Sequence, residues 1–178
     1  MKREDVETLL AEYDFEDFRW IAPEDIAIRQ WVRFMCVESC PGYGKKAVCP
    51  PNVPAIEECE RFFSEYNAAI LIRFEMNAHH RDDDPEVFKD IDQRLLKLEE
   101  RLFYEGHQKA IVFPATICYR CDDCPGRRDL CRHKESARPT PEALGVDLFE
   151  TVKKVGYPLK IVKDMEETMN RYALLMVD

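Results

Sequence analysis

Residues 109–131, KAIVFPATICYRCDDCPGRRDLC, place a strand-like run directly ahead of four closely spaced cysteines. Residues 109–114, with the apolar run Ala-Ile-Val-Phe at their centre, predict a strand that runs toward the first of these cysteines. The cysteines follow the spacing C-x2-C-x2-C-x6-C and are Cys118, Cys121, Cys124 and Cys131. Thiolates at successive two-residue gaps can hold three corners of a cubic iron–sulfur cluster, and bacterial ferredoxins use the same triple spacing. We therefore predict that these four cysteines bind one [4Fe–4S] cluster.

Structural zinc is the alternative at this second cysteine group (Cys118 to Cys131). Zinc sites usually combine two short cysteine pairs separated by a longer stretch, which this spacing fits less well. His133 is an alternative ligand. The group also contains many basic residues, which would stabilise a reduced cluster, dock an acidic partner, or pair with nearby aspartates. These are Arg120, Arg127, Arg128, Arg132 and Lys134.

A first cysteine group lies upstream and contains Cys36, Cys40 and Cys49. Neighbouring prolines stiffen this segment, and glycines let the backbone approach an inorganic centre closely. We predict a metal site here, which makes a second cluster an open alternative. Cys59 is either a fourth ligand or a core residue, because it shares a helix face with Phe63. If the first group holds a cubic iron–sulfur cluster through three cysteines only, the fourth iron has no cysteine ligand and would be open to a substrate.

Hydrophobic periodicity predicts the elements around these groups. Helices are predicted at residues 3–13, 55–66 and 85–105, with further helix starts at Thr140 and Asp147. Strands are predicted at residues 26–35, 68–74, 109–114, 158–163 and 171–177. We expect an α/β or α+β sandwich with a central mixed sheet, flanking helices and two cysteine-rich metal-binding loops.

The expected organisation is a single domain over residues 1–178, with cysteine-rich loops at 36–54 and 118–138. Both loops follow a predicted strand, one ending at residue 35 and the other running to 117. If these strands are parallel neighbours, both metal centres lie at one edge of the sheet. The polar stretch 79–84, which includes two adjacent histidines, is predicted to be a solvated loop, with Asp84 capping the following helix.

Charge and composition exclude some classes of function. The 178 residues carry 26 basic and 35 acidic side chains, a net charge of −9, which argues against binding nucleic acid or an anionic membrane. No apolar signal core or membrane span is evident, so we expect a cytoplasmic protein. Disulfides are rare in that compartment, and clustered cysteines there more often bind metal or carry out redox chemistry.

Two segments carry a resemblance to a known family. They are CVESCPGYGKKAVCPPNVP at 36–54 and CYRCDDCPGRRDLCRHKESARPTPEALG at 118–145. Both resemble a family of predicted metal-binding proteins of unknown function, found largely in anaerobic bacteria and archaea. The resemblance implies that the seven cysteines of both groups are metal-site residues, and it does not extend to Cys59. It implies no particular reaction.

These features favour electron transfer in anaerobic metabolism, with a redox partner protein. One alternative is a zinc-stapled interaction module without redox chemistry. Another is a metalloenzyme with an open iron at the first cysteine group. Whether the protein is an enzyme, and its oligomeric state, are not determined by the sequence.

Overall fold

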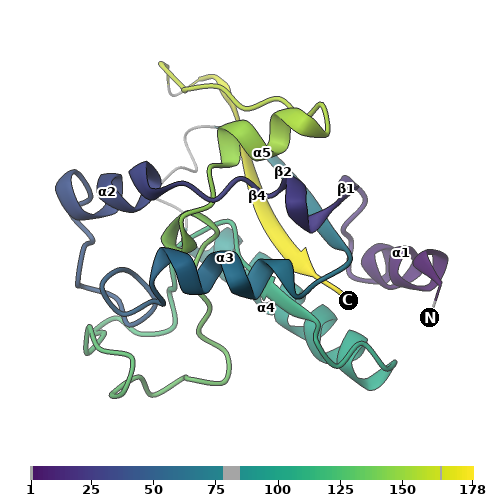
Figure 1. Ribbon diagram of the computed structural model, residues 1–178, viewed down its shortest axis with the longest axis horizontal. Helices are drawn as coiled ribbons and strands as arrows, with labels where there is room; N and C mark the ends of the chain where they lie inside the picture. Colours follow the sequence, from purple (N-terminus) through teal and green to yellow (C-terminus); the bar gives the residue numbers. More distant parts are fainter. Residues whose placement is uncertain (1, 78–84, 165) are drawn as a thin grey trace.

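The computed structural model describes residues 2–77, 85–164 and 166–178 and has an α+β fold (Figure 1). The strands are β1 (Phe18–Ile21), β2 (Ala69–Asn77), β3 (Ile111–Phe113) and β4 (Thr168–Met176). The α-helices are α1 (Arg3–Glu12), α2 (Gln30–Glu38), α3 (Ile56–Ser64), α4 (Pro85–Tyr104) and α5 (Leu148–Lys154). Short 3-10 helices are η1 (Pro23–Asp25) and η3 (Glu142–Leu144).

The four strands form one sheet in the order β1-β2-β4-β3, and every neighbouring pair is antiparallel. The expectation of a mixed sheet is therefore wrong. It depended on a strand at residues 26–35, which the structure does not contain. The long β2 and β4 strands form the centre of the sheet, whereas β3 pairs only with the end of β4, from Leu174 to Met176.

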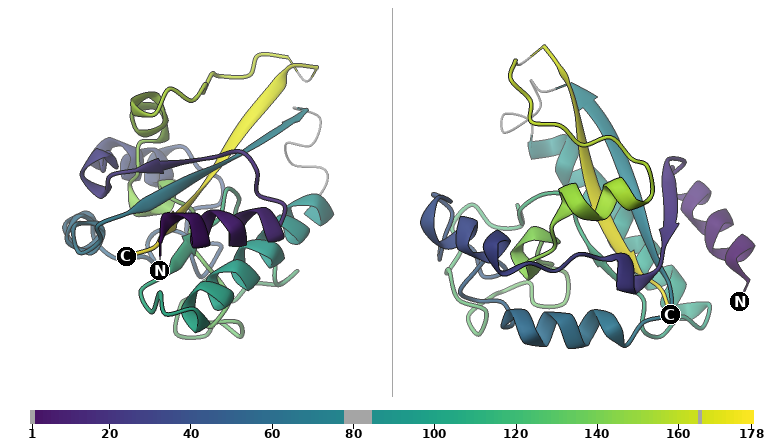
Figure 2. Two further views of the ribbon diagram at one scale, coloured as in Figure 1. Left: turned by 90° about the vertical axis from the view of Figure 1, so that its right-hand side faces the viewer. Right: turned by 45° about the horizontal axis from the view of Figure 1, so that its top comes forward.

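Alternation along the strands gives the sheet two buried faces. Ile70 and Leu175 point to the face covered by α1 and α4, where they meet residues such as Leu10 and Leu98. Figure 2 shows these two helices together on one side of the sheet. The pattern explains why β2 begins with four consecutive fully buried residues.

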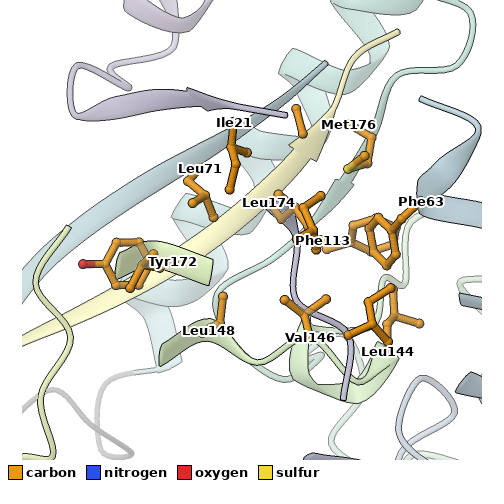
Figure 3. Close-up of a cluster of buried hydrophobic side chains, with 14 of the residues drawn as sticks. Ile21, Phe63, Leu71, Phe113, Leu144, Val146, Leu148, Tyr172, Leu174 and Met176 are labelled. Carbon is orange, nitrogen blue, oxygen red and sulfur yellow. The ribbon is translucent and has the colours of Figure 1, made fainter. Parts of the chain in front are cut away.

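The opposite face packs against α3, α5 and the turn that precedes α5. Leu71, Tyr172 and Leu174 contribute to this core from the sheet, and Phe63 contributes from α3 (Figure 3). Because helices and turns cover both faces, the expected sandwich is confirmed.

The predicted strand at 26–35 is wrong. Ile28 forms only an isolated bridge with Val146, and the chain then enters α2 at Gln30. Val32 is the single buried residue of α2, while Trp31 and Phe34 are exposed. Because α2 buries so little surface, it lacks the buried apolar stripe that marks a helix in a sequence. The alternation of apolar and polar residues over 26–35 was therefore interpreted as a strand.

Most other predicted elements are confirmed, including the helices at 3–13, 55–66 and 85–105 and the strands at 68–74, 109–114 and 171–177. The Asp147 side chain caps α5 by accepting a hydrogen bond from the Glu150 backbone N–H. The helix predicted to start at Thr140 is limited to η3. The strand predicted at 158–163 is wrong, because this segment pairs with no strand in the described chain. β1 was not predicted.

The loop expected at 79–84 and its capping residue Asp84 lie outside the described residues. Within the described parts of the chain, no helix combines the length and apolar character that crossing a membrane requires.

Candidate metal centre

The four cysteines of the second group line one small cavity. Cys118, Cys121, Cys124 and Cys131 are each half-buried in the irregular segment that follows β3. The cavity volume is about 10 Å³. Apolar and basic residues complete its wall, namely Lys46, Ala47, Val48, Arg120, His133 and Ala137. Four soft sulfur donors therefore surround one enclosed space that has little other polar surface.

Part of this wall comes from the segment that carries the first cysteine group. The Ala47 backbone N–H donates a hydrogen bond to the Cys124 sulfur, with a nitrogen–sulfur distance of 3.4 Å. A backbone N–H directed at sulfur stabilises a thiolate and therefore also a metal bound to it. The spacing of the cysteines gave no sign of this contact, because the two residues are 77 positions apart.

Two further contacts hold the cysteine-bearing segments together. The Asn52 side-chain amide donates across to the Gly126 carbonyl of the other segment at 2.8 Å, and within its own segment to the Lys46 carbonyl at 3.3 Å. A Cβ atom at Gly126 would lie only 2.8 Å from the carbonyl oxygen of Gly44. Only glycine permits such a close approach of the two backbones. Figure 1 shows the two segments side by side below α2.

The first cysteine group gathers where α2 ends. Cys36 lies in the last turn of this helix, Cys40 lies just beyond it, and Cys49 comes from the following run of turns. Burial raises the pKa of the Cys49 thiol to about 11, and the thiols of Cys40, Cys36 and Cys118 add further electrostatic opposition to its ionisation. Burial, followed by the neighbouring Cys40, also raises the pKa of Cys36. Cys49 thus lies within electrostatic range of both cysteine groups.

Cys59 lies in the hydrophobic core with Phe63 and is only 3% exposed. Its thiol lies 3.8 Å from the Pro54 carbonyl oxygen. Burial raises the pKa of this thiol, which the nearby Arg33 partly offsets. The structure thus places Cys59 as a core residue of α3.

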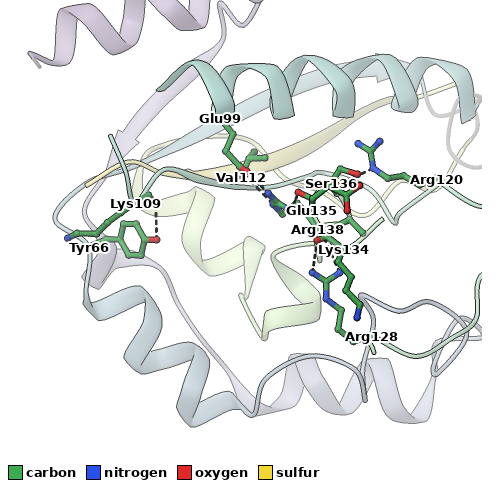
Figure 4. Close-up of polar contacts among 11 residues, drawn as sticks. Tyr66, Glu99, Lys109, Val112, Arg120, Arg128, Lys134, Glu135, Ser136 and Arg138 are labelled. Carbon is green, nitrogen blue, oxygen red and sulfur yellow. Dashed lines mark hydrogen bonds and ion pairs between the residues drawn. The ribbon is translucent and has the colours of Figure 1, made fainter. Parts of the chain in front are cut away.

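Most of the basic side chains near the second group bind backbone carbonyls (Figure 4). Arg120 donates to the Ser136 carbonyl, and Arg128 donates to the carbonyls of Lys134 and Ala137. Arg132 similarly donates to a backbone carbonyl. An aspartate pairing is present at Arg127, which binds Asp129. These cations therefore hold the segment in shape, while Arg120 also lines the cysteine cavity.

The Cys118 thiol experiences two opposing effects. Burial raises its pKa, whereas a backbone hydrogen bond from Arg120 and the positive charges of Arg120 and Lys46 lower it.

Among the described residues, no three His, Cys, Asp or Glu side chains are arranged so that they could hold a single metal ion. All eight cysteines lie in described segments and carry free thiols.

The fold and these contacts define a small α+β protein in which two cysteine groups meet next to one sheet. The chain belongs to the family of predicted metal-binding proteins known as DUF2284, whose family model matches residues 19–177. This confirms the resemblance inferred from the cysteine segments. Neither a search of curated proteins nor a search of solved structures gave a match.

Proposed function

We propose that Cys118, Cys121, Cys124 and Cys131 hold a [4Fe–4S] cluster and that the protein transfers electrons. The observation that carries this proposal is the convergence of all four cysteines on one cavity. Thiolates are the ligands that such clusters prefer, and a four-cysteine set is the usual complement. When bound, the cluster would accept and release single electrons.

The spacing of the cysteines favours a cluster over zinc. Zinc sites usually combine two short cysteine pairs separated by a longer stretch. The three cysteines at successive two-residue gaps instead match the spacing that bacterial ferredoxins use for a cubic cluster.

The surrounding residues support a redox role. The Ala47 N–H and the positive charges of Arg120 and Lys46 would stabilise negative charge on the cysteine sulfurs. These contacts favour the reduced state of a bound cluster. Because Cys49 lies within electrostatic range of Cys118, a metal centre at the first group would be close enough to exchange electrons with the second. Electrons would come from, or pass to, a separate redox protein in the cytoplasm.

The test is metal analysis of the whole chain purified without oxygen. We expect about four iron and four acid-labile sulfide per chain, or about eight of each if the first group also binds a cluster. The visible absorption should bleach on reduction with dithionite and return on oxidation. One zinc without sulfide would contradict the proposal and leave a zinc-stapled module as the better account.

A second candidate function is favoured by one observation. Cys36 and Cys40 line a separate cavity of about 510 Å³, a size that suits a small organic ligand. The first group provides three cysteines, and Cys59 is held in the core instead of joining them. A cluster at this group would therefore keep one iron open to the cavity, as a metalloenzyme requires. A change in the spectrum of the first centre on adding a ligand would support this function, and an unchanged spectrum would count against it.

A further inference from the structure

A polar cavity of about 320 Å³ lies between α4 and the segment of the second cysteine group. Lys89 and Asp92 line it from α4, and Arg120 and His133 line it from the cysteine segment (Figure 4 shows Arg120 beside α4). The rest of its wall is formed by Gln93, Tyr119 and Asp122. Arg120 and His133 also line the small cavity of the four cysteines. Asp92 therefore faces residues that also surround the cysteine sulfurs.

The Asp92 carboxyl is partly buried in this cavity, and no hydrogen bond or ion pair joins it to another residue in the described parts of the chain. A carboxylate placed in this way loses hydration without gaining a partner. Burial raises the pKa of Asp92 to about 7, and the nearby charge of Arg120 opposes this effect only in part. The carboxyl can thus gain or lose a proton near neutral pH without breaking a contact.

The other charged groups around the cavity behave differently. Lys89 pairs with Glu86 on its own helix, and Asp122 is exposed to solvent. Arg120 keeps its positive charge because a guanidinium does not lose its proton in proteins. His133 is the remaining group that can titrate near neutral pH, so a test must separate it from Asp92.

An electron that enters a cluster at the second cysteine group adds one negative charge behind the wall that Arg120 and His133 form. A nearby negative charge disfavours an ionised carboxylate and raises its affinity for a proton. Salt screens such an interaction only weakly where the groups are partly buried. Reduction at the cysteines should therefore favour the protonated form of Asp92.

We propose that Asp92 takes up one proton when the second cysteine group accepts one electron, so that the reduction potential of the protein depends on pH. The electron comes from the redox partner protein. The proton comes from water in the cavity and forms an O–H bond on the Asp92 carboxylate. This inference deepens the proposed function and rests on it, because it names the residue that compensates the charge of the electron.

The test is a potentiometric titration of the whole chain, purified without oxygen, at pH values from about 5.5 to 9.5. Asp92 is protonated in both redox states at the acid end and ionised in both at the alkaline end, so the potential should be constant there. Between these limits it should fall as the pH rises. If reduction raises the proton affinity of Asp92 at least about threefold, the total fall is at least about 30 mV.

Three variants assign the proton to one residue. Asp92→Asn keeps the size of the side chain and resembles the protonated form, so its potential should be independent of pH and equal to the acid limit of the wild type. Asp90→Asn is the matched control, because Asp90 is exposed on the same helix and pairs with Arg94. This variant should keep the full pH dependence, and so should His133→Gln.

Iron and acid-labile sulfide are measured first on every sample. Their absence from the wild type would overturn the cluster proposal and this inference together. A chain that contains the cluster but has a potential independent of pH would overturn this inference alone. So would a pH dependence that persists in Asp92→Asn and is lost in His133→Gln, because the proton would then reside on the histidine.

Discussion

At the scale of single residues, burial controls the charge of the thiols in the two cysteine groups. The pKa of the Cys49 thiol is about 11, so this thiol is protonated at neutral pH when no metal is bound. Metal binding must displace such protons, which is the usual coupling between thiol ionisation and metal affinity. The Cys118 thiol is easier to ionise because the positive charges of Arg120 and Lys46 lower its pKa and so oppose the effect of its burial.

Asp92 on α4 lies in a pocket with Arg120 and His133, and burial raises the pKa of its carboxyl to about 7 from 3.8. The unfolded chain thus ionises this group more easily than the folded chain. The resulting cost to stability is absent below pH 3.8, grows up to about pH 7 and is then constant. Asp92→Asn should therefore leave stability nearly unchanged at about pH 4 but raise it by about 1 to 3 kcal/mol at about pH 8. Urea unfolding at both pH values checks this, and a gain that shrinks as the pH rises would contradict it.

The spacing of the cysteines was enough to select the site candidates at this scale, but it could not identify the residues that join the two groups. Ala47 acts through its backbone N–H, and Asn52 acts through a side-chain amide that reaches two carbonyls. Neither residue type is characteristic of a metal site. Their role depends on the packing of two distant segments, which a local pattern cannot reveal.

At the scale of elements, strongly amphipathic segments were predictable and weakly buried ones were not. α4 buries a regular stripe that includes Leu95, Leu98 and Leu102, so its helical period is clear in the sequence. α2 buries only Val32 and was mistaken for a strand. β1 was missed because it has four residues and only one of them is fully buried.

The contact between the two cysteine-bearing segments depends on Gly126. Its φ is +65°, and an added Cβ would meet the Gly44 carbonyl oxygen at 2.8 Å. Gly126→Ala should lower the free energy of unfolding by about 3 kcal/mol or more, through backbone strain together with the clash. It should also reduce the iron retained per chain, because Ala47 would move away from Cys124.

Gly44→Ala is the matched control. Gly44 has a similar φ of +70°, but no atom lies within 4 Å of its Cβ position. Only the backbone strain of about 1 to 2 kcal/mol is expected there. Equal losses of stability and iron in the two variants would show that the close approach at Gly126 is unimportant.

At the scale of the whole molecule, a partly buried ion pair attaches the segment of the second cysteine group to the sandwich. Arg138, which follows the second cysteine group, binds Glu99 of α4, and the two side chains are only 16% and 14% exposed. Glu99 also accepts a hydrogen bond from the Val112 backbone N–H of β3 at 2.7 Å. One carboxylate therefore joins a helix, an edge strand and the segment that carries the second cysteine group.

Glu99→Ala should lower the free energy of unfolding by about 2 to 4 kcal/mol, because it leaves the Arg138 charge buried without this partner. Glu100→Ala changes an exposed neighbour on the same helix and should cost no more than about 0.5 kcal/mol. Chemical unfolding of both variants provides the comparison. Similar values for the two would mean that the ion pair does not attach the cysteine segment to the sandwich.

The α+β class could be predicted because helical and strand periods are both present along the chain. The arrangement of the sheet could not, since a mixed sheet was expected and the sheet is wholly antiparallel. Both cysteine groups were expected to follow strands, which would have brought them to one edge of the sheet if those strands were parallel neighbours. The first group instead begins with Cys36 in the last turn of the helix α2. The two groups nevertheless meet, because direct contacts between the segments, such as the one at Gly126, bring them together.

The most direct test of the central claim is the iron and acid-labile sulfide content of Cys121→Ala and Cys59→Ala, purified without oxygen beside the wild-type chain. Cys121 lines the four-cysteine cavity, whereas Cys59 lies in the core of α3. We predict that Cys121→Ala loses about four iron and four sulfide per chain and that Cys59→Ala retains the wild-type content. Iron and sulfide unchanged by Cys121→Ala, or wild-type protein containing zinc without sulfide, would contradict the assignment of a cluster to the second cysteine group.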